Sequence, residues 1–307
     1  MNRPTIVALH GCGETLRHRL EDTLAAAGAA GQVRAQPLGG GDTGRAWRLT
    51  DPHHRQFFLK LIGPLAPAQA AAMGSAEADG LTALASCPVL RLPRVLGSGS
   101  DDATAFLLLE HVAMRPPAEA DAPTLAAALI SLHRRIWPAY GWRRDNFIGP
   151  TPQLNGWWAD WGAFFAARRL APLLGRLAGR DAALDAAGQR LLAALPRLLA
   201  GHHPPASLLH GDLWRGNVAL DAQGRATLFD PAVHAGDRES DLAMMALFGG
   251  LEAVLAAYEA RWPLPPGHER RRALYQSYHL LNHYLLFGAG YGRQARSAIE
   301  RALGGDA

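Results

Sequence analysis

Three polar residues in the second half of the chain have the types and spacing that phosphoryl transfer requires. Asp212 and Asn217 lie five residues apart on a glycine-broken segment, and Asp230 follows thirteen residues later, after a short apolar run. A carboxylate can orient and deprotonate an attacking hydroxyl, while carboxylate and amide oxygens are suitable ligands for Mg²⁺. We therefore interpret Asp212 as a catalytic base and Asn217 and Asp230 as Mg²⁺ ligands. An ordinary polar turn is the alternative, because these residue types favour loops.

One feature of the composition singles out Lys60. Of the 31 basic residues of the chain, 30 are arginine and Lys60 is the only lysine. GC-biased codon usage exchanges lysine for arginine wherever either cation serves, so a retained lysine marks a site that needs a compact ammonium. Chance retention is the alternative. Lys60 ends a strand-like run and Glu77 follows on a predicted helix, and we interpret the two as the pair that holds nucleotide phosphates.

A glycine cluster precedes Lys60 between two predicted strands. It contains Gly39, Gly40, Gly41 and Gly44. Because the cluster does not open a helix, it is neither a Walker loop nor a dinucleotide-binding turn. We interpret Gly39, Gly40 and Gly41 as a flexible cover over the phosphates, and a plain hairpin turn is the alternative.

The first third of the chain is expected to form a small sheet-based lobe that positions Lys60. Short apolar runs bounded by turn residues alternate there with two helical patterns. The strands are expected at residues 33–38, 46–49, 57–62, 94–96 and 105–110, and the helices at 14–27 and 67–85. Glu110 ends the last of these strands, at the place where a kinase-type lobe has its nucleotide hinge.

Beyond a proline-bearing linker at 114–123, the chain is expected to be mainly helical. Helices are predicted around 125–132 and at 158–174, 182–199, 242–262 and 270–287. Short apolar pieces between 208 and 229 predict a β-insert that carries the polar loops. The expected fold is α+β, a protein-kinase-like two-lobe fold, with a nucleotide-binding lobe over 1–111 and a catalytic and substrate-binding lobe over 112–307.

Composition and charge exclude several other classes. The 307 residues are 49% hydrophobic and 19% charged, as in globular proteins. No apolar run reaches the roughly 18 residues of a membrane helix. The net charge of +4 comes from scattered arginines, and the cysteines, Cys12 and Cys87, have no disulfide or metal spacing. We expect a soluble, cytoplasmic protein without nucleic-acid or membrane partners, and a monomer is favoured.

A second polar segment, 236–241, follows the predicted Mg²⁺ ligands. Asp241 stands at a predicted helix start, where its carboxylate can cap N–H groups or brace the neighbouring loop. Asp237 and Glu239 are candidates for facing a substrate, with a structural role as the alternative. The paired histidines at 202–203 lie in a predicted turn without the spacing of a zinc site, and we expect them to be solvated.

Several motifs resemble the fructosamine kinase (ketosamine-3-kinase) family over about residues 38–286. They are His210-Gly-Asp-Leu-Trp-Arg-Gly-Asn-Val218, Asp230-Pro-Ala-Val233, Gly236-Asp-Arg-Glu239, Asp241-Leu-Ala-Met244, Leu247-Phe-Gly-Gly250 and the stretch from Asn146 to Leu170. The H-G-D-x-x-x-x-N core is shared with aminoglycoside and choline kinases, whereas the Leu-Trp pair and the Asp-Pro-Ala ending are typical of the ketosamine branch. Arg215 departs from the pattern, because a small residue is common there.

The resemblance implies transfer of the ATP γ-phosphate to the C3 hydroxyl of a ketosamine, such as a fructosamine, ribulosamine or erythrulosamine. The 3-phosphate is a good leaving group, so the adduct would then break down and free the amine. The implied cofactors are ATP and Mg²⁺. The implied site comprises Asp212 as proton acceptor, Asn217 and Asp230 as metal ligands, Lys60 and Glu77 at the phosphates, Glu110, His111 and Val112 as the adenine hinge, and Trp214 as a substrate contact.

Two other functions stay open at this point. A phosphotransferase of the same fold could act on an aminoglycoside or an amino alcohol, whose positive charge would need an acidic pocket. A pseudokinase would bind only a nucleotide or a partner protein. The intact set of Lys60, Asp212, Asn217 and Asp230 argues against the pseudokinase, because a scaffold without catalysis needs no such set.

Overall fold

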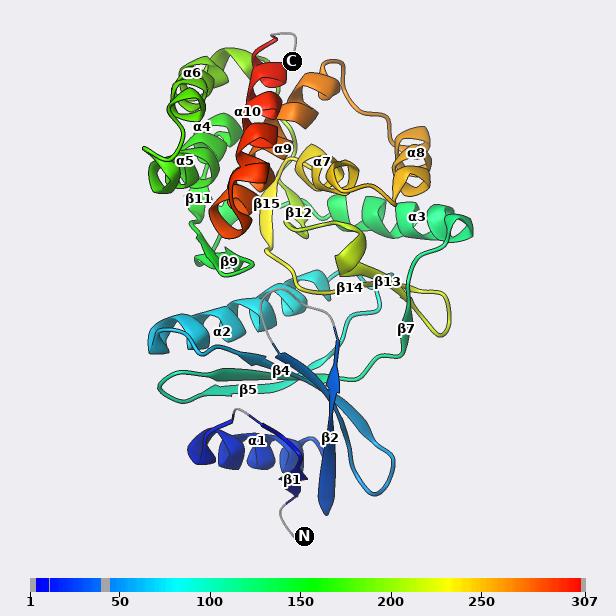
Figure 1. The fold of residues 1–307 in the computed structure, drawn as a ribbon. Helices are drawn as coiled ribbons and strands as arrows, with labels where there is room; N and C mark the ends of the chain where they lie inside the picture. Colours follow the sequence, from blue (N-terminus) through cyan, green and yellow to red (C-terminus); the bar gives the residue numbers. More distant parts are fainter. Residues whose placement is uncertain (1–3, 11, 40–44, 305–307) are drawn as a thin grey trace.

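The computed structural model describes residues 4–10, 12–39 and 45–304, which form a curled sheet with flanking helices and a larger, mainly helical part (Figure 1). The predicted α+β class is confirmed. The sheet order is β1 (Thr5–Val7), β2 (Gln32–Leu38), β3 (Arg45–Thr50), β4 (Gln56–Ile62), β6 (Ala105–Glu110) and β5 (Val95–Ser100). Its neighbouring strands are antiparallel except for β1 and β2. Two helices cover it, α1 (Glu14–Ala26) and α2 (Pro67–Leu84).

Strand β6 is buried on both faces because α1 and α2 lie on opposite sides of the sheet (Figure 1). Phe106 and Leu108 belong to the core that includes α1, whereas Leu107 and Leu109 pack with Leu81 of α2. This alternation follows the two-residue period of a strand. It explains why the sequence of β6 is a continuous apolar run rather than an alternating one.

The second part of the molecule combines helices with small sheets (Figure 1). Its helices are α3 (Ala122–His133), α4 (Trp161–Phe165), α5 (Ala171–Leu177), α6 (Ala182–Leu198), α7 (Glu239–Leu247), α8 (Glu252–Arg261), α9 (His268–Phe287) and α10 (Ala289–Leu303), with helical turns η1 (Glu119–Asp121), η2 (Ala166–Leu170) and η3 (Arg215–Asn217). Its strands are β7 (Met114–Arg115), β8 (Tyr140–Trp142), β9 (Asn146–Ile148), β10 (Thr151–Gln153), β11 (Gly156–Trp158), β12 (Ser207–Leu209), β13 (Val218–Asp221), β14 (Ala226–Leu228) and β15 (His234–Gly236). No helix in the described ranges has both the length and the apolar character needed to cross a bilayer.

The predicted helix over 242–262 is wrong, because the chain breaks between α7 and α8. Gly249 and Gly250 have φ values of 69° and 79°, which a right-handed helix cannot accommodate. The break turns the chain sharply between Phe248 and Glu252. This turn lies beside η3, since Arg215 donates a hydrogen bond to the carbonyl oxygen of Gly250.

Two further predictions need correction. The helix expected over 158–174 begins only at Trp161, where Asp160 accepts a hydrogen bond from the backbone of Ala163 at 2.7 Å and caps the first turn. The proline-bearing linker at 114–123 contains ordered structure, because β7 pairs with β13 and α3 already begins at Ala122. Prolines are compatible with both a linker and a first helical turn, so composition alone did not separate the two.

Candidate active site

The loop between β12 and β13 holds Asp212 and Asn217 side by side. Asn217 Nδ2 donates to the carbonyl oxygen of Asp212 at 2.9 Å and to its carboxylate Oδ2 at 3.3 Å. Gly211 has a φ of 83°, and a Cβ at this position would lie 2.1 Å from the carbonyl oxygen of Ala232. Glycine is therefore required here, and the tight turn presents Asp212 next to the amide of Asn217.

The His210 ring joins the Asp212 loop to the strand end before Asp230. His210 Nε2 lies 2.9 Å from the carbonyl oxygen of Phe229 and therefore carries the hydrogen, while Nδ1 accepts from the backbone N–H of Asp212 at 3.3 Å. Burial lowers the pKa of His210, which keeps the ring neutral. A neutral ring with one donor and one acceptor nitrogen satisfies both bonds.

Asp241 braces this loop from below, as predicted. Its carboxylate accepts the backbone N–H groups of His210 and Gly211, each at 2.8 Å, and contacts His133 Nε2 at 3.1 Å. Burial alone would raise the pKa of Asp241, but the hydrogen bond and charge of His133 hold it below its usual range. The bonds go to the catalytic loop rather than to the first turn of α7.

We expect Asp241→Asn to lower the free energy of unfolding by about 2–3 kcal/mol, because an amide cannot accept all of these bonds and turns its NH₂ toward a donor. Urea unfolding measures the loss. Asp102→Asn, in the exposed turn between β5 and β6, is the matched control and should change stability by less than about 0.5 kcal/mol. An unchanged midpoint for Asp241→Asn would contradict the brace.

Lys60 joins three elements that are distant in the sequence. Its ammonium donates to Glu77 Oε2 of α2 at 2.8 Å and to Asp230 Oδ1, beyond β14, at 2.7 Å. The Lys60 and Glu77 side chains are 10% and 13% exposed, whereas that of Asp230 is 41% exposed. The predicted pair of Lys60 and Glu77 is thus in contact, and the carboxylate of Asp230 is the most accessible of the three groups.

Burial and charge act in opposite directions on this group. Burial alone would lower the pKa of Lys60, but the two carboxylates raise it above its usual range. Burial raises the pKa of Glu77 in spite of the attraction of Lys60, and the nearby charge of Asp230 adds to the rise. Two carboxylates therefore share one ammonium. If another cation bound Asp230, Lys60 would keep its ion pair with Glu77 and would be available to pair with a further anion.

Asp230 has a left-handed backbone conformation, with a φ of 53°. Such a conformation is rare for a residue other than glycine and is found mainly where the surroundings enforce it. The next residue, Pro231, packs closely on α2, where a Cβ at Gly80 would lie 2.9 Å from it. Sequence reasoning missed Gly80, although a glycine in the middle of a helix is a sign of close packing.

The predicted hinge and the glycine cluster are only partly described. The Glu110 carboxylate pairs with Arg91 at 2.6 Å, and its backbone N–H donates to Arg94. His111 and Val112 follow and are half-buried. Among the described atoms, nothing lies within 4 Å of a Cβ built on Gly39. Gly40 and Gly41 lie outside the described residues.

Trp214 lies two residues after Asp212 in the sequence and is half-buried. Its ring meets Phe248 edge-on, with 6.0 Å between centroids. A Cβ at Gly216 would lie 2.3 Å from the Trp214 ring, so this glycine allows the ring to fold back over the loop. Trp214 thus forms a wall beside the catalytic loop.

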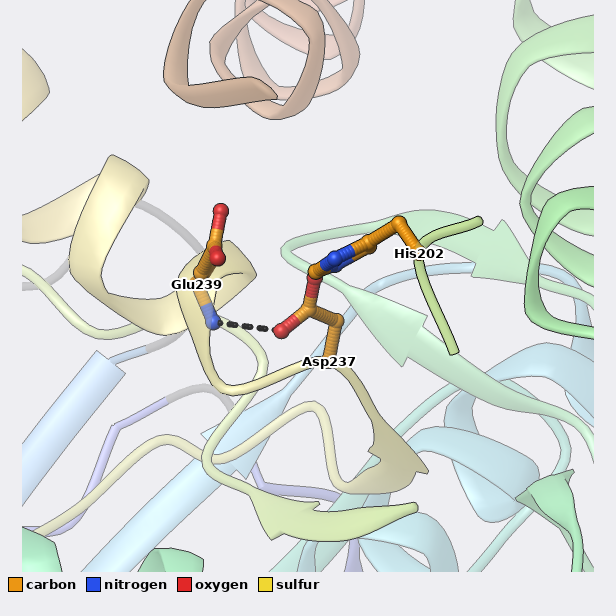
Figure 2. A group of neighbouring side chains, drawn as sticks. All are labelled: His202, Asp237 and Glu239. Atoms are coloured by element: carbon orange, nitrogen blue, oxygen red, sulfur yellow. Dashed lines mark hydrogen bonds and ion pairs between the residues drawn. The ribbon is translucent and has the colours of Figure 1, made fainter. Parts of the chain in front are cut away.

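Asp237 and Glu239 lie in a buried ion network with His202, and Figure 2 shows the three side chains. Asp237 accepts from His202 Nε2 and from the Tyr275 hydroxyl, both at 2.7 Å. The expectation of a solvated His202 is wrong, because its side chain is only 11% exposed and faces this carboxylate. Glu239 accepts two hydrogen bonds from Arg271 at 2.8 Å.

The network explains why Asp237 and Glu239 are 1% and 3% exposed. The ligand atoms of His202, Asp237 and Glu239 lie within 4.8 Å of one another, a spacing compatible with a cation. However, Arg271 already balances the charge of Glu239, and the Asp237 oxygens accept three bonds, one of them from the backbone of Glu239. We interpret the cluster as a structural support rather than a substrate or metal site.

A second polar network, which the sequence did not single out as a site, lies near Asp212. Tyr278 of α9 donates to Gln153 Oε1 at 2.8 Å, and Gln153 donates to Asn146. Burial raises the pKa of Tyr278 to about 12; Arg169 opposes this rise, and the charge of Asp212 adds to it. The helix α9 therefore contributes to the surroundings of the catalytic loop.

Two buried histidines make stability depend on pH. Burial lowers the pKa of His234 and of His279 to about 3. The unfolded chain binds a proton at each near pH 6.5, so the free energy of unfolding falls as the pH drops from about 6.5 toward 3. The test measures the free energy of unfolding in urea at about pH 7 and about pH 5.5. When the pH is lowered, we expect this free energy to fall by about 1 kcal/mol less for His279→Gln than for the parent protein. Identical losses would contradict a buried neutral His279.

Comparison with known proteins adds a family context to this geometry. Residues 18–304 match the model of the family described as fructosamine kinase. The chain is 37% identical over 268 residues to a "Probable ketoamine kinase" of Synechocystis sp., a match that covers 87% of this chain and 89% of the relative. It is also 37% identical over 254 residues to the chloroplastic protein-ribulosamine 3-kinase of Oryza sativa subsp. indica, covering 80% and 72% of the two chains.

The fold is similar to that of a crystal structure from Thermobifida fusca that is provisionally named fructosamine-3-kinase. The TM-score is 0.80 at 34% sequence identity, and the alignment covers 92% of this chain and 97% of the other. An aminoglycoside-3′-phosphotransferase of type VIII is more distant, with a TM-score of 0.51 and 26% identity. The similarity is thus greater to the first structure than to the second.

Proposed function

Because the chain belongs to the fructosamine kinase family, we propose that it transfers the γ-phosphate of ATP to the C3 hydroxyl of a ketosamine. One observation carries this proposal from the structure. Lys60, Glu77 and Asp230 come from three distant elements and meet in one contact group, and His210 links the Asp212–Asn217 loop to Phe229, the residue before Asp230. A chain with only a scaffolding role would not need this arrangement.

In the proposed mechanism, Asp212 accepts a hydrogen bond from the C3 hydroxyl and takes its proton as the oxygen attacks. The new bond joins this oxygen to the γ-phosphorus, while the bond from phosphorus to the β,γ-bridging oxygen breaks and ADP leaves. Lys60 holds the phosphates, and Glu77 holds Lys60. Asn217 positions Asp212 through the hydrogen bonds from its amide.

The residues fit a divalent cation of the Mg²⁺ type. Asn217 and Asp230 offer an amide and a carboxylate oxygen, which are hard ligands, and the Asp230 carboxylate is the accessible member of the Lys60 group. When bound, such an ion would neutralise charge on the phosphates. Asn217 and Asp230 would hold this ion, and Asp230 would offer it the more accessible carboxylate of the Lys60 group.

The two parts of the fold have separate tasks in this proposal. Residues 1–111 form the nucleotide-binding lobe, with Gly39, Gly40 and Gly41 over the phosphates and Glu110 and His111 along the adenine. Val112, the first residue of the second lobe, completes this hinge. Residues 112–307 form the catalytic and substrate-binding lobe, with Trp214 beside the sugar. After transfer, the 3-phosphate of the ketosamine is lost and the amine is released.

ADP release with fructoselysine, ribuloselysine and erythruloselysine, compared side by side, tests the proposal. We expect turnover with at least one of the three and a preference for one sugar length. Kanamycin and choline serve as acceptors for the competing phosphotransferase function. ADP release with these acceptors alone, or with none of the five compounds, would overturn the proposal.

A further inference from the structure

A cavity of about 320 Å³ lies beside the catalytic loop, between η3, the start of α8 and the segment before η1. Its walls are partly apolar, and one basic and two acidic side chains belong to its lining. The lining residues with side chains used below are Glu119, Arg215, Leu251, Glu252 and Val254. The cavity therefore has positively and negatively charged side chains next to an apolar surface. Its basic residue, Arg215, lies three residues after Asp212 in the sequence.

The guanidinium of Arg215 is held in place by the turn between α7 and α8. Its Nη1 donates to the carbonyl oxygen of Gly250 at 3.1 Å. A Cβ at Gly250 would lie 2.7 Å from Arg215 Cδ and 2.9 Å from Nη1, so the glycine makes room for the arginine. A guanidinium carries five N–H donors, and this one bond leaves donors for a ligand.

The acidic partner at this position is also fixed. Glu252 Oε1 accepts from the backbone N–H of Gly250 at 2.9 Å. Backbone N–H groups hold the pKa of Glu252 below its usual range, and the charge of Arg215 acts in the same direction. Glu252 is therefore ionised, and Glu119 lines the same cavity. A ligand with a carboxylate and an ammonium close together matches Arg215 and these two carboxylates.

Resting on the proposed function, we propose that this cavity binds the amine half of a ketosamine built on a free α-amino acid of the lysine type. The α-carboxylate pairs with Arg215, the α-ammonium pairs with Glu252 and Glu119, and the apolar side-chain methylenes lie along Leu251 and Val254. A planar guanidinium suits a carboxylate because it can donate two parallel hydrogen bonds.

The reach of the substrate is compatible with this placement. Three residues of extended chain span at most about 11 Å, which limits the separation of the Asp212 and Arg215 Cα atoms. A lysine side chain together with the first three sugar carbons has a comparable length. The reacting hydroxyl can therefore lie at Asp212 while the amino-acid end reaches Arg215. Protein-bound lysine lacks the free α-carboxylate, so the cavity favours low-molecular-weight adducts.

Four adducts of one sugar separate the charges: those of lysine, Nα-acetyl-lysine, lysine amide and butylamine. The adduct of butylamine lacks both charges, the amide lacks the carboxylate and the acetyl derivative lacks the ammonium. For the parent protein we expect kcat/KM to be at least about 10-fold higher for the lysine adduct than for the butylamine adduct, mainly through KM. The amide and acetyl adducts are expected to lie between them.

Two variants assign the charges to residues. Arg215→Ser should lower kcat/KM about 10-fold for the adducts of lysine and acetyl-lysine but less than 2-fold for those of lysine amide and butylamine. Glu252→Gln keeps a side-chain oxygen that accepts the hydrogen bond from the Gly250 N–H. It should lower kcat/KM for the lysine and lysine-amide adducts instead. Arg293→Ser, at an exposed position of α10, controls for the loss of one positive charge and should change none of the four.

The two proposals fail in different ways. Equal kcat/KM of the parent protein for the lysine and butylamine adducts, or equal losses on all four adducts in Arg215→Ser, would overturn the cavity assignment and leave ketosamine phosphorylation intact. No ADP release with any of the four adducts or with the longer and shorter sugars would overturn both the proposed function and this inference.

Discussion

Asp212→Asn is expected to reduce kcat by about 10²–10⁴-fold while leaving ATP affinity within about 2-fold of the parent value. The substitution keeps the size of the side chain and its place beside Asn217, but an amide cannot take a proton from the attacking hydroxyl. The bonds that fix the loop come from its backbone to Asp241 and His210, and they do not need the Asp212 carboxylate. The loss should therefore fall on turnover rather than on folding.

Steady-state ADP release with the preferred ketosamine measures the change in kcat, and titration calorimetry with ATP measures nucleotide affinity. Asp102→Asn, in the exposed turn between β5 and β6, is the matched control and should leave both quantities unchanged. A parent-like kcat for Asp212→Asn would remove Asp212 from the chemistry. A loss of ATP affinity equal to the loss of kcat would instead place Asp212 in nucleotide binding.

The parts of this protein that could be predicted are those set by local patterns. The strand β6 follows from a short apolar run and the helix α2 from an alanine-rich stretch, and both lie within one or two residues of their expected bounds. The D-x-x-x-x-N spacing predicted that Asp212 and Asn217 lie on one loop. Residues five positions apart on a glycine-containing turn are close enough to contact each other. The contact of Lys60 with Glu77 was also expected, since a strand followed by a packed helix brings the two together.

The parts that could not be predicted depend on contacts between distant segments. The strands β8 and β15 are three residues long and pair only with each other and with other short strands, so they have no periodic signal of their own. The helix α10 contains Gly290 and Gly292, which have a low helix propensity, and it is stabilised by packing on α9 and α6. The contact of His133 with Asp241 joins residues 108 positions apart.

The segment 236–241 shows how acidic side chains close together in the sequence have different partners. Asp237, Glu239 and Asp241 are all buried, yet their partners are a histidine and a tyrosine, an arginine, and the backbone of the catalytic loop. Charge alone suggested that two of them face a substrate. Burial and pairing are tertiary properties, so Asp237 and Glu239 are interpreted as structural support only from the structure, whereas that role was predicted for Asp241.

Lys60→Arg is expected to lower kcat/KM for ATP by at least about 100-fold, although the charge is conserved. The ammonium lies in a narrow site between Glu77 and Asp230, at 2.8 Å and 2.7 Å, and its side chain is 10% exposed. A guanidinium is larger and planar, so it would either push α2 away from the sheet or leave the site and form bidentate pairs with the carboxylates. In both cases the group that holds the phosphates is displaced.

The apparent KM for ATP and kcat, measured at a saturating concentration of the preferred ketosamine, separate the two effects. A rise in KM with a smaller fall in kcat assigns Lys60 to nucleotide binding, whereas an equal fall in both kcat and kcat/KM assigns it to transition-state stabilisation. Glu77→Gln is the companion variant, because it keeps Lys60 but removes the carboxylate that positions it. Its loss should be smaller than that of Lys60→Arg, since the ammonium that contacts the phosphates stays present. An unchanged kcat/KM in Lys60→Arg would mean that the only lysine of the chain was retained for the contact with Glu77 and not for the nucleotide.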